Sequence, residues 1–242
     1  PERDSRVNYA AEELLACTIA RLIGDAAHVA VGAASPIPAT ACVLLRAQGN
    51  PLRVSLLHKR RGNPFSEGSR ELFDLAGQGR IDVFFLGGAQ IDGEANINLV
   101  RADEHRFPGS FGSAFMYFAA KRTILFREEH SRRVLVPKVD FVSAPGWSPP
   151  EVWRRGGPQA MLTGKALFAW QTEQRRFRLV SVHPGHTAEE VRADTGFDFD
   201  APAAVPPTPA PFAEDLALLR GPVAREVAEN YPGFARRVWG EK

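Results

Sequence analysis

Helix-like and strand-like hydrophobic patterns alternate along the first 130 residues of the chain. Residues 9–23 place apolar side chains three or four positions apart, which predicts an amphipathic helix ending near Gly24. The other predicted helices cover 37–46 and 69–79, and the predicted strands cover 28–36, 51–58, 81–88, 122–128 and 138–147. The run at 81–88 is apolar throughout, as is typical of a strand buried on both faces. Strands that alternate with helices predict a layered α/β fold around a mostly parallel sheet.

The pattern changes in the second half of the chain. Residues 166–171 and 176–185 resemble an antiparallel pair that turns around 172–174. A loop rich in Pro, Gly and Arg is predicted at 147–158, and 201–212 contains five prolines that favour an extended linker or wrap. Two short helices are predicted at about 212–220 and 222–229. We therefore expect an α/β domain at 1–200 and a Pro-rich wrap with C-terminal helices at 201–242.

Composition excludes several classes of protein. The 242 residues are 44% hydrophobic and 24% charged, with a net charge of only +2, so we expect no nucleic-acid partner. No apolar stretch reaches the roughly 20 residues of a membrane span, and the charged start of the chain lacks an apolar signal core. Its two cysteines, Cys17 and Cys42, lie in apolar windows and are expected to be buried in a reducing compartment. The sequence thus predicts a cytoplasmic protein without a membrane partner.

Several short motifs give no convincing site. The glycines of GQGRID (77–82) precede a strand, whereas a dinucleotide fingerprint follows one. TGKA (163–166) lacks the upstream glycine and the hydroxyl residue of a phosphate loop. HPGH (183–186) has no third metal ligand nearby and is interpreted as a turn, and HKRR (58–61) is interpreted as a solvated charge run rather than a phosphate site. We predict no metal site.

The segment FFLGGAQIDGEANIN (84–98) is the strongest candidate for a functional site. Gly87 and Gly88 end a predicted buried strand, and ligands of open α/β sheets bind beyond such strand ends. A missing side chain there lets a ligand approach the main chain, but two glycines equally suit a tight strand-to-loop turn. Both interpretations stay open on spacing alone.

From this segment outward, the chain resembles family I CoA-transferases, in particular the β subunit of glutaconate CoA-transferase. The resemblance covers nearly the whole chain. The motifs that carry it, in order, are VGAASP (31–36), IDVFFLGGAQID (81–92), the amides Asn96 and Asn98, RFPGSFGSA (106–114), SRRVLVPKVDFVSAPGW (131–147) and TAEEVRADTGFDFD (187–200).

This resemblance implies a Rossmann-like α/β/α subunit with a mostly parallel central sheet. It also implies an α-type partner subunit, in a heterodimer or heterotetramer, with the acyl-CoA site between the two subunits. The resemblance indicates no resident cofactor, because coenzyme A enters as part of the substrate. Expected substrate contacts are Gly87, Gly88, Ala89, Gln90 and Asn96 around the first loop, and Gly109, Ser110, Phe111 and Gly112 in the second. Asn96 and Asn98 could instead satisfy turn main chain. Phe111 is an added bulky residue where relatives read close to GSGGA, and it should narrow or reshape the acyl pocket.

The glutamate nucleophile that transferases of this family use is missing from its expected position. Counting from Val31 and Gly32 brings that position to Leu56, and its neighbours are not carboxylates. Glu67 would need an eleven-residue slip and follows a turn-like GNPF. His58 is the nearest titratable group, either a base that activates water or, as we favour, a solvent-facing strand-end residue.

Three functions remain open at this point. The first is a β-type subunit of an acyl-CoA hydrolase, carbon–carbon bond-cleaving enzyme or decarboxylase, in which water or a substrate carboxylate replaces the enzyme glutamate. The second is a genuine CoA-transferase that uses Glu67 or another displaced carboxylate. The third is a non-catalytic subunit that binds CoA esters or stabilises its α-type partner.

Overall fold

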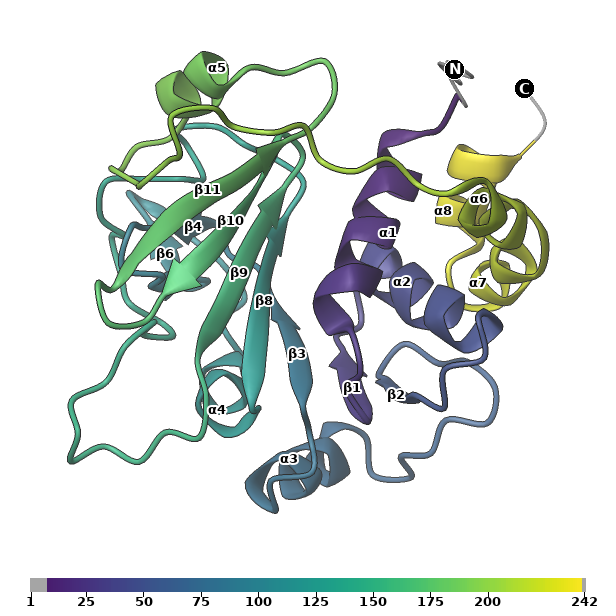
Figure 1. The fold of residues 1–242 in the computed structure, drawn as a ribbon. Coiled ribbons are helices and arrows are strands. Elements are labelled where there is room, and N and C mark those ends of the chain that lie inside the picture. Colours follow the sequence, from purple (N-terminus) through teal and green to yellow (C-terminus); the bar gives the residue numbers. More distant parts are fainter. Residues whose placement is uncertain (1–7, 241–242) are drawn as a thin grey trace.

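A twisted seven-stranded sheet forms the centre of the computed structural model, which describes residues 8–240 (Figure 1). Its strand order is β11-β10-β9-β8-β3-β1-β2. The strands are β1 (His28–Val31), β2 (Arg53–Leu56), β3 (Val83–Leu86), β8 (Arg122–Arg127), β9 (Pro158–Thr163), β10 (Ala166–Gln171) and β11 (Arg176–Val182). The pairs from β2 to β9 are parallel, and only the two pairs made by β10 are antiparallel. The prediction of a mostly parallel α/β sheet is confirmed.

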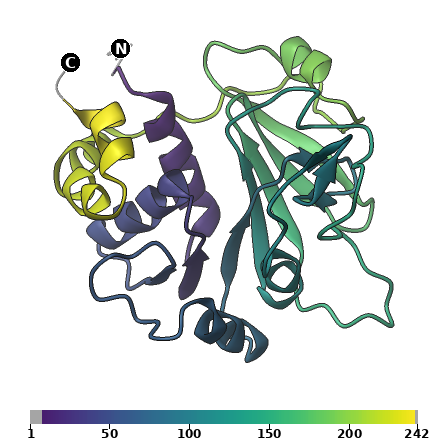
Figure 2. The same cartoon turned by 180° about the vertical axis from the view of Figure 1, so that it is seen from behind.

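Helices and two small hairpins cover the sheet. The helices are α1 (Ala11–Ile23), α2 (Pro36–Ala47), α3 (Ser69–Gly77), α4 (Ser113–Ala119), α5 (Ala188–Asp194), α6 (Ala213–Leu218), the π-helical turn η1 (Leu219–Val223), α7 (Ala224–Asn230) and α8 (Pro232–Trp239). The hairpins are β4 (Gln90–Ile91) with β5 (Ile97–Asn98), and β6 (Arg101–Ala102) with β7 (His105–Arg106). Viewed from behind, α1, α2 and the C-terminal helices stand on one side of the strands, with α4 and the hairpins on the other (Figure 2).

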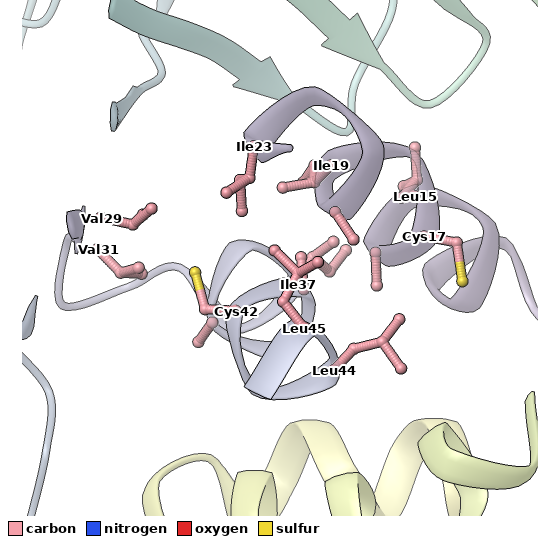
Figure 3. Close-up of a cluster of buried hydrophobic side chains, with 14 of the residues drawn as sticks. Leu15, Cys17, Ile19, Ile23, Val29, Val31, Ile37, Cys42, Leu44 and Leu45 are labelled. Atoms are coloured by element: carbon pink, nitrogen blue, oxygen red, sulfur yellow. The ribbon is translucent and has the colours of Figure 1, made fainter. Parts of the chain in front are cut away.

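Two hydrophobic clusters fill the two sides of the sheet. The first joins α1 and α2 to one face of the sheet and to the C-terminal helices, and it contains both cysteines (Figure 3). Burial raises the pKa of the Cys17 and Cys42 thiols to about 12, so both stay protonated and inert near neutral pH. The prediction that they are buried is therefore confirmed. The second cluster lies under α3, α4 and the hairpins, where Tyr117 is fully buried and its hydroxyl donates to the carbonyl of Ala95 (3.0 Å).

The Pro-rich segment crosses from the β11 side of the sheet to the C-terminal helices (Figure 1). Its main chain bonds to β11 through Val182, whose amide donates to Pro206 and whose carbonyl accepts from Thr208. Arg21 of α1 donates to the carbonyls of Pro209 and Ala210, at 2.8 Å each. The helices that follow bury Leu216, Leu219, Val223, Val227 and Phe234 in the same cluster as α1 and α2. In the part of the chain that the structure describes, no helix has the length and apolar character needed to cross a bilayer.

The predicted strand at 138–147 is wrong. Apart from an isolated bridge between Ile97 and Ala144, this stretch is irregular. Pro145 and Gly146 interrupt it, and a Cβ on Gly146 would lie 2.2 Å from the carbonyl oxygen of Glu94. Close contact with the β4–β5 hairpin therefore replaces strand pairing.

Candidate active site at the strand ends

The carboxyl ends of five parallel strands line up along one edge of the sheet, in the order β9, β8, β3, β1, β2. Ligand sites of open α/β sheets form at such an edge. Gly87 follows β3, Gly32 follows β1, and Leu57 and His58 follow β2. This edge is therefore the place where the predicted site residues can meet.

Gly87 and Gly88 make room for the main chain of the protein itself. A Cβ on Gly87 would lie 2.7 Å from the carbonyl oxygen of Phe126, and one on Gly88 would lie 2.7 Å from that of Gln90. The second Cβ would also meet Ile97 at 2.9 Å. These contacts are too short for any larger residue, so the tight-turn interpretation holds whether or not a ligand also approaches. Ala89 continues the turn and donates its amide to the carbonyl of Asn98 (2.9 Å).

Gln90 is buried in a network that ties three segments together. Its side-chain oxygen accepts from Asn98 Nδ2 (2.7 Å) and from the amide of Asp140 (3.0 Å), and its Nε2 donates to Asp140 Oδ2 (3.2 Å). Asp140 also accepts from the amide of Asp103 (2.9 Å). These bonds fix the β4–β5 hairpin against the 138–147 stretch. A substrate contact by Gln90 would have to use the second N–H of its amide.

Asn96 belongs to the hairpin turn. Asp92 is buried and accepts from the amides of Glu94 (3.1 Å) and Asn96 (3.0 Å), an arrangement typical of an Asx turn. The Asn96 side chain donates to Asp92 (3.2 Å) and accepts from the amide of Gly146 (3.1 Å). Asn98 in turn accepts from the amides of Val100 (3.0 Å) and of the residue after it. The structure therefore favours the alternative that these amides satisfy turn main chain.

The second predicted loop, 109–112, packs on α3. Gly109 and Phe111 both adopt positive φ angles, of 111° and 49°. The Phe111 ring is 80% exposed and lies 5.6 Å from the Phe73 ring of α3, centre to centre. Gly112 begins α4 against the same ring, and the Ser110 carbonyl accepts from the amide of the residue that follows Gly112 (3.0 Å). Phe111 therefore points outward instead of filling a cavity of this chain.

The end of β2, where the resemblance places the missing nucleophile, is covered by the C-terminal helices. Leu56 is the last residue of the strand and is buried next to Val31 of β1. Tyr231, between α7 and α8, stacks its ring on His58 at 4.9 Å and donates its hydroxyl to the carbonyl of Ala33 (3.1 Å). Burial raises the pKa of the Tyr231 hydroxyl to about 12. His58 lies just after the strand end, as predicted, and is half-buried beneath this ring.

Glu67 lies in the loop before α3. Its carboxylate is largely exposed and pairs with Arg70 at 3.0 Å, and its amide donates to Glu71 (3.0 Å). These are the contacts of a helix N-terminal loop on the surface. Within residues 8–240, no hydrogen bond or ion pair links Glu67 to the glycines after β3.

Two carboxylates beside the candidate site are absent from the sequence-based prediction. Glu128 and Glu129 follow β8 directly, and β8 pairs with β3. Glu129 accepts from Ser131 (2.6 Å) and from Arg133, and these contacts hold the pKa of its carboxyl below the usual range. The predicted strand at 122–128 ends at this position, so its strand-end carboxylates could have been found from the sequence. Both oxygens of Glu129 already have partners in Ser131, Arg133 and Arg127, so it suits a structural role better than a nucleophilic one.

Comparison with known proteins identifies the family. The coenzyme A transferase family model matches residues 55–194, more than half of the chain, and the chain belongs to this family. It is 28% identical to the β subunit of the 3-oxoadipate CoA-transferase of Pseudomonas knackmussii, over 92% of this chain and 96% of that protein. It is 32% identical to the β subunit of the glutaconate CoA-transferase of Acidaminococcus fermentans, over 51% of this chain and 50% of that protein.

Relatives with other activities match as well. The cholesterol ring-cleaving hydrolase IpdB subunit of Rhodococcus jostii is 29% identical over 62% of each chain. The crystal structure of the decarboxylase AibA/AibB superposes with a TM-score of 0.76 at 25% identity, over 97% of this chain and all of that one. The fold expected from the resemblance is confirmed, and the family includes transferases, hydrolases and decarboxylases.

Proposed function

We propose that the chain is the β-type subunit of a heteromeric enzyme that acts on acyl-CoA thioesters without a nucleophilic carboxylate of its own. The reaction is hydrolysis, carbon–carbon bond cleavage or decarboxylation, and the α-type partner completes the site. The single observation that carries the proposal is the end of β2. A buried leucine, Leu56, stands there and lines a small cavity together with Tyr231, where the resemblance requires a glutamate.

An anhydride route has strict geometric requirements. A carboxylate oxygen must reach the thioester carbon, form a carbon–oxygen bond and expel CoA as the thiolate. Leu56 cannot do this, and Glu67 lies in the surface loop before α3, where it pairs with Arg70. In the proposed hydrolytic route, water attacks the thioester carbon after a base removes its proton, the carbon–sulfur bond breaks, and CoA leaves.

The residues of this chain then act mainly as a scaffold for the substrate. The main chain at Gly87 and Gly88 forms the floor of the acyl-CoA site, and Gln90 offers its remaining N–H to the acyl group. Ala89, Asn96, Gly109, Ser110 and Gly112 shape the two loops around it, and Phe111 projects from the second loop toward the partner side. His58, whose ring stacks on Tyr231, is the candidate base of this chain nearest to Leu56.

A genuine CoA-transferase remains the second candidate. Two observations favour it: the chain matches the β subunit of a 3-oxoadipate CoA-transferase over nearly the full length of both proteins, and Glu67 is exposed enough to reach a partner subunit. The third possibility, a non-catalytic partner subunit, has no comparable support.

The test is to purify the chain with an α-type partner and supply a panel of acyl-CoA esters. Release of CoA or carbon dioxide without an added acceptor acid supports the proposal. Turnover that requires a second carboxylic acid, and that is lost in Glu67→Ala but kept in Asp74→Ala, a variant at an exposed carboxylate of α3, establishes the transferase instead. If no ester releases CoA or carbon dioxide, gives a product of carbon–carbon bond cleavage, or passes its CoA to an added acid, the subunit is non-catalytic.

A further inference from the structure

A cavity of about 360 Å³ opens at the opposite edge of the sheet, where β8 and β9 begin. The loop at 147–157 forms one wall as it runs below the sheet toward the start of β9 (Figure 1). The residues that give this cavity its chemistry are Lys121, Arg122, Arg154, Arg155, Trp147 and Trp170. None of the residues that line it is an aspartate or a glutamate.

Within the described residues, no carboxylate forms an ion pair with the cations of this cavity, its lysine and its three arginines. The whole protein carries a net charge of only +2, so four unpaired cations around one cavity are a local concentration. Glu151 and Glu173 are near in sequence but do not line it. A site of this kind attracts anions.

The guanidinium groups are held in place by carbonyls, which orient them without cancelling their charge. Arg122 donates to Ile23 (2.7 Å), Arg155 to Ile81 (3.0 Å) and Arg154 to Pro145 (2.6 Å). Arg154 also lies over the rings of Tyr117 and Phe118, at 4.8 and 4.4 Å, and its buried Nε has no hydrogen-bond partner. Guanidinium groups held in a fixed orientation can donate two hydrogen bonds at once to phosphate oxygens.

Two indoles stand beside these cations. Trp147 is 41% exposed, with Arg175 over its ring at 3.7 Å, and Trp170 is half-buried against Phe177. An aromatic base can stack on an indole while its phosphates meet the arginines. We propose that this cavity binds the phosphate-bearing part of a purine nucleotide.

That nucleotide is either the end of a CoA ester or a free nucleotide. Arg122 is paired with Val83 of β3, four residues before Gly87, so cavity and strand-end glycines are about 13 Å apart along the strand. Gly146 of the cavity wall also donates to Asn96 of the hairpin turn. An extended pantetheine arm is long enough for such a separation, and because β3 is buried it would have to pass over the surface near Gly146 and Asn96. This assignment to the CoA ester rests on the proposed function, whereas nucleotide binding itself does not.

The test is calorimetric titration of the full chain with ADP, with pyrophosphate and free CoA as parallel ligands. Lys121→Gln/Arg155→Gln should weaken ADP binding at least tenfold, because two charged contacts are lost. The matched control is Arg225→Gln/Arg236→Gln, which removes the same charge from exposed positions on α7 and α8 and should change nothing. Because Arg155 also supports the carbonyl of Ile81, Lys121→Gln alone provides a milder variant that should still weaken binding severalfold.

Each outcome either tests whether the cavity binds a nucleotide or identifies which molecule carries that nucleotide. No ADP binding, equal binding by wild type and both cavity variants, or pyrophosphate binding as tightly as ADP would overturn it. If ADP competes with acyl-CoA in the complex with the α-type partner, and the double variant raises KM with little change in kcat, the nucleotide belongs to the CoA ester. If the double variant loses ADP binding while KM for acyl-CoA is unchanged, the cavity binds a free nucleotide. The ADP titration needs no turnover, so a failure of the proposed function leaves it interpretable.

Discussion

Replacing Gly88 by alanine should destabilise the protein and displace the candidate site. The new Cβ would lie 2.7 Å from the carbonyl oxygen of Gln90, 2.9 Å from Ile97 Cγ2 and 3.3 Å from the carbonyl oxygen of Asn98. Two of these three atoms are main chain and cannot rotate away. Overpacking of this kind costs about 1–3 kcal/mol, which for a chain of this size lowers Tm by roughly 2–4 °C per kcal/mol.

The matched control is Gly233→Ala in α8. No atom lies within 4 Å of its Cβ position, and its φ is not positive. Alanine should therefore stabilise this helix by roughly 0.5–1 kcal/mol. Urea and thermal unfolding of both variants, followed by circular dichroism, measure the difference. If Gly88→Ala is as stable as the wild type, the turn after β3 is not packed as described and the argument from close approach fails.

Three further changes test other parts of the structure. Glu67→Gln should alter stability by less than about 0.5 kcal/mol and leave thioester cleavage unchanged, because its pair with Arg70 is exposed; a large loss of turnover would refute this. Burial lowers the pKa of His130 to about 4, below the value of about 6.5 in the unfolded chain. Neutral His130 therefore makes its full contribution to the free energy of unfolding above pH 6.5, and this contribution is lost as the pH falls from 6.5 toward 4. Unfolding measured from pH 4 to 7 should thus show a pH dependence, of up to roughly 3 kcal/mol, that shrinks in His130→Gln, and equal slopes would contradict the assignment. Tyr231→Phe removes the bond to the Ala33 carbonyl and should cost about 1 kcal/mol in urea unfolding, whereas no loss would mean that this hydroxyl is satisfied by water.

Much of the sheet can be predicted because several of its strands have a hydrophobic pattern that is recognisable in the local sequence. The apolar run at 81–88 contains β3, and the alternation at 166–182 contains β10 and β11. β9 escapes prediction, because it begins at Pro158 at the end of a stretch whose composition favours a loop, and it is recognisable only by its pairing with β8. The 138–147 stretch is predicted as a strand and is not one. Val139 and Ala144 are buried, whereas Phe141, Val142 and Trp147 are exposed, and only Ala144 forms a bridge to the hairpin, at Ile97.

The candidate site is only partly predictable. Local spacing places Gly87 and Gly88 correctly at a strand end, because glycine pairs after an apolar run have few other uses. The packing of the C-terminal helices over the end of β2 cannot be predicted from local sequence. Tyr231, which stacks on His58, lies more than 170 residues further along the chain. The roles of Gln90 and Asn98 are equally hidden, because their partners depend on how the hairpin folds back.

The central claim is that no carboxylate of this chain attacks the thioester, and covalent trapping tests it most directly. The chain and its α-type partner are incubated with acyl-CoA esters, borohydride is added, and the intact mass of each subunit is recorded. Borohydride reduces an enzyme glutamyl-CoA thioester to an alcohol, which leaves a small mass loss at one residue. The account predicts release of CoA or carbon dioxide with no mass change in this subunit. A mass loss that maps to Glu67, or to any other carboxylate of the chain, would contradict it and establish a transferase with a displaced nucleophile.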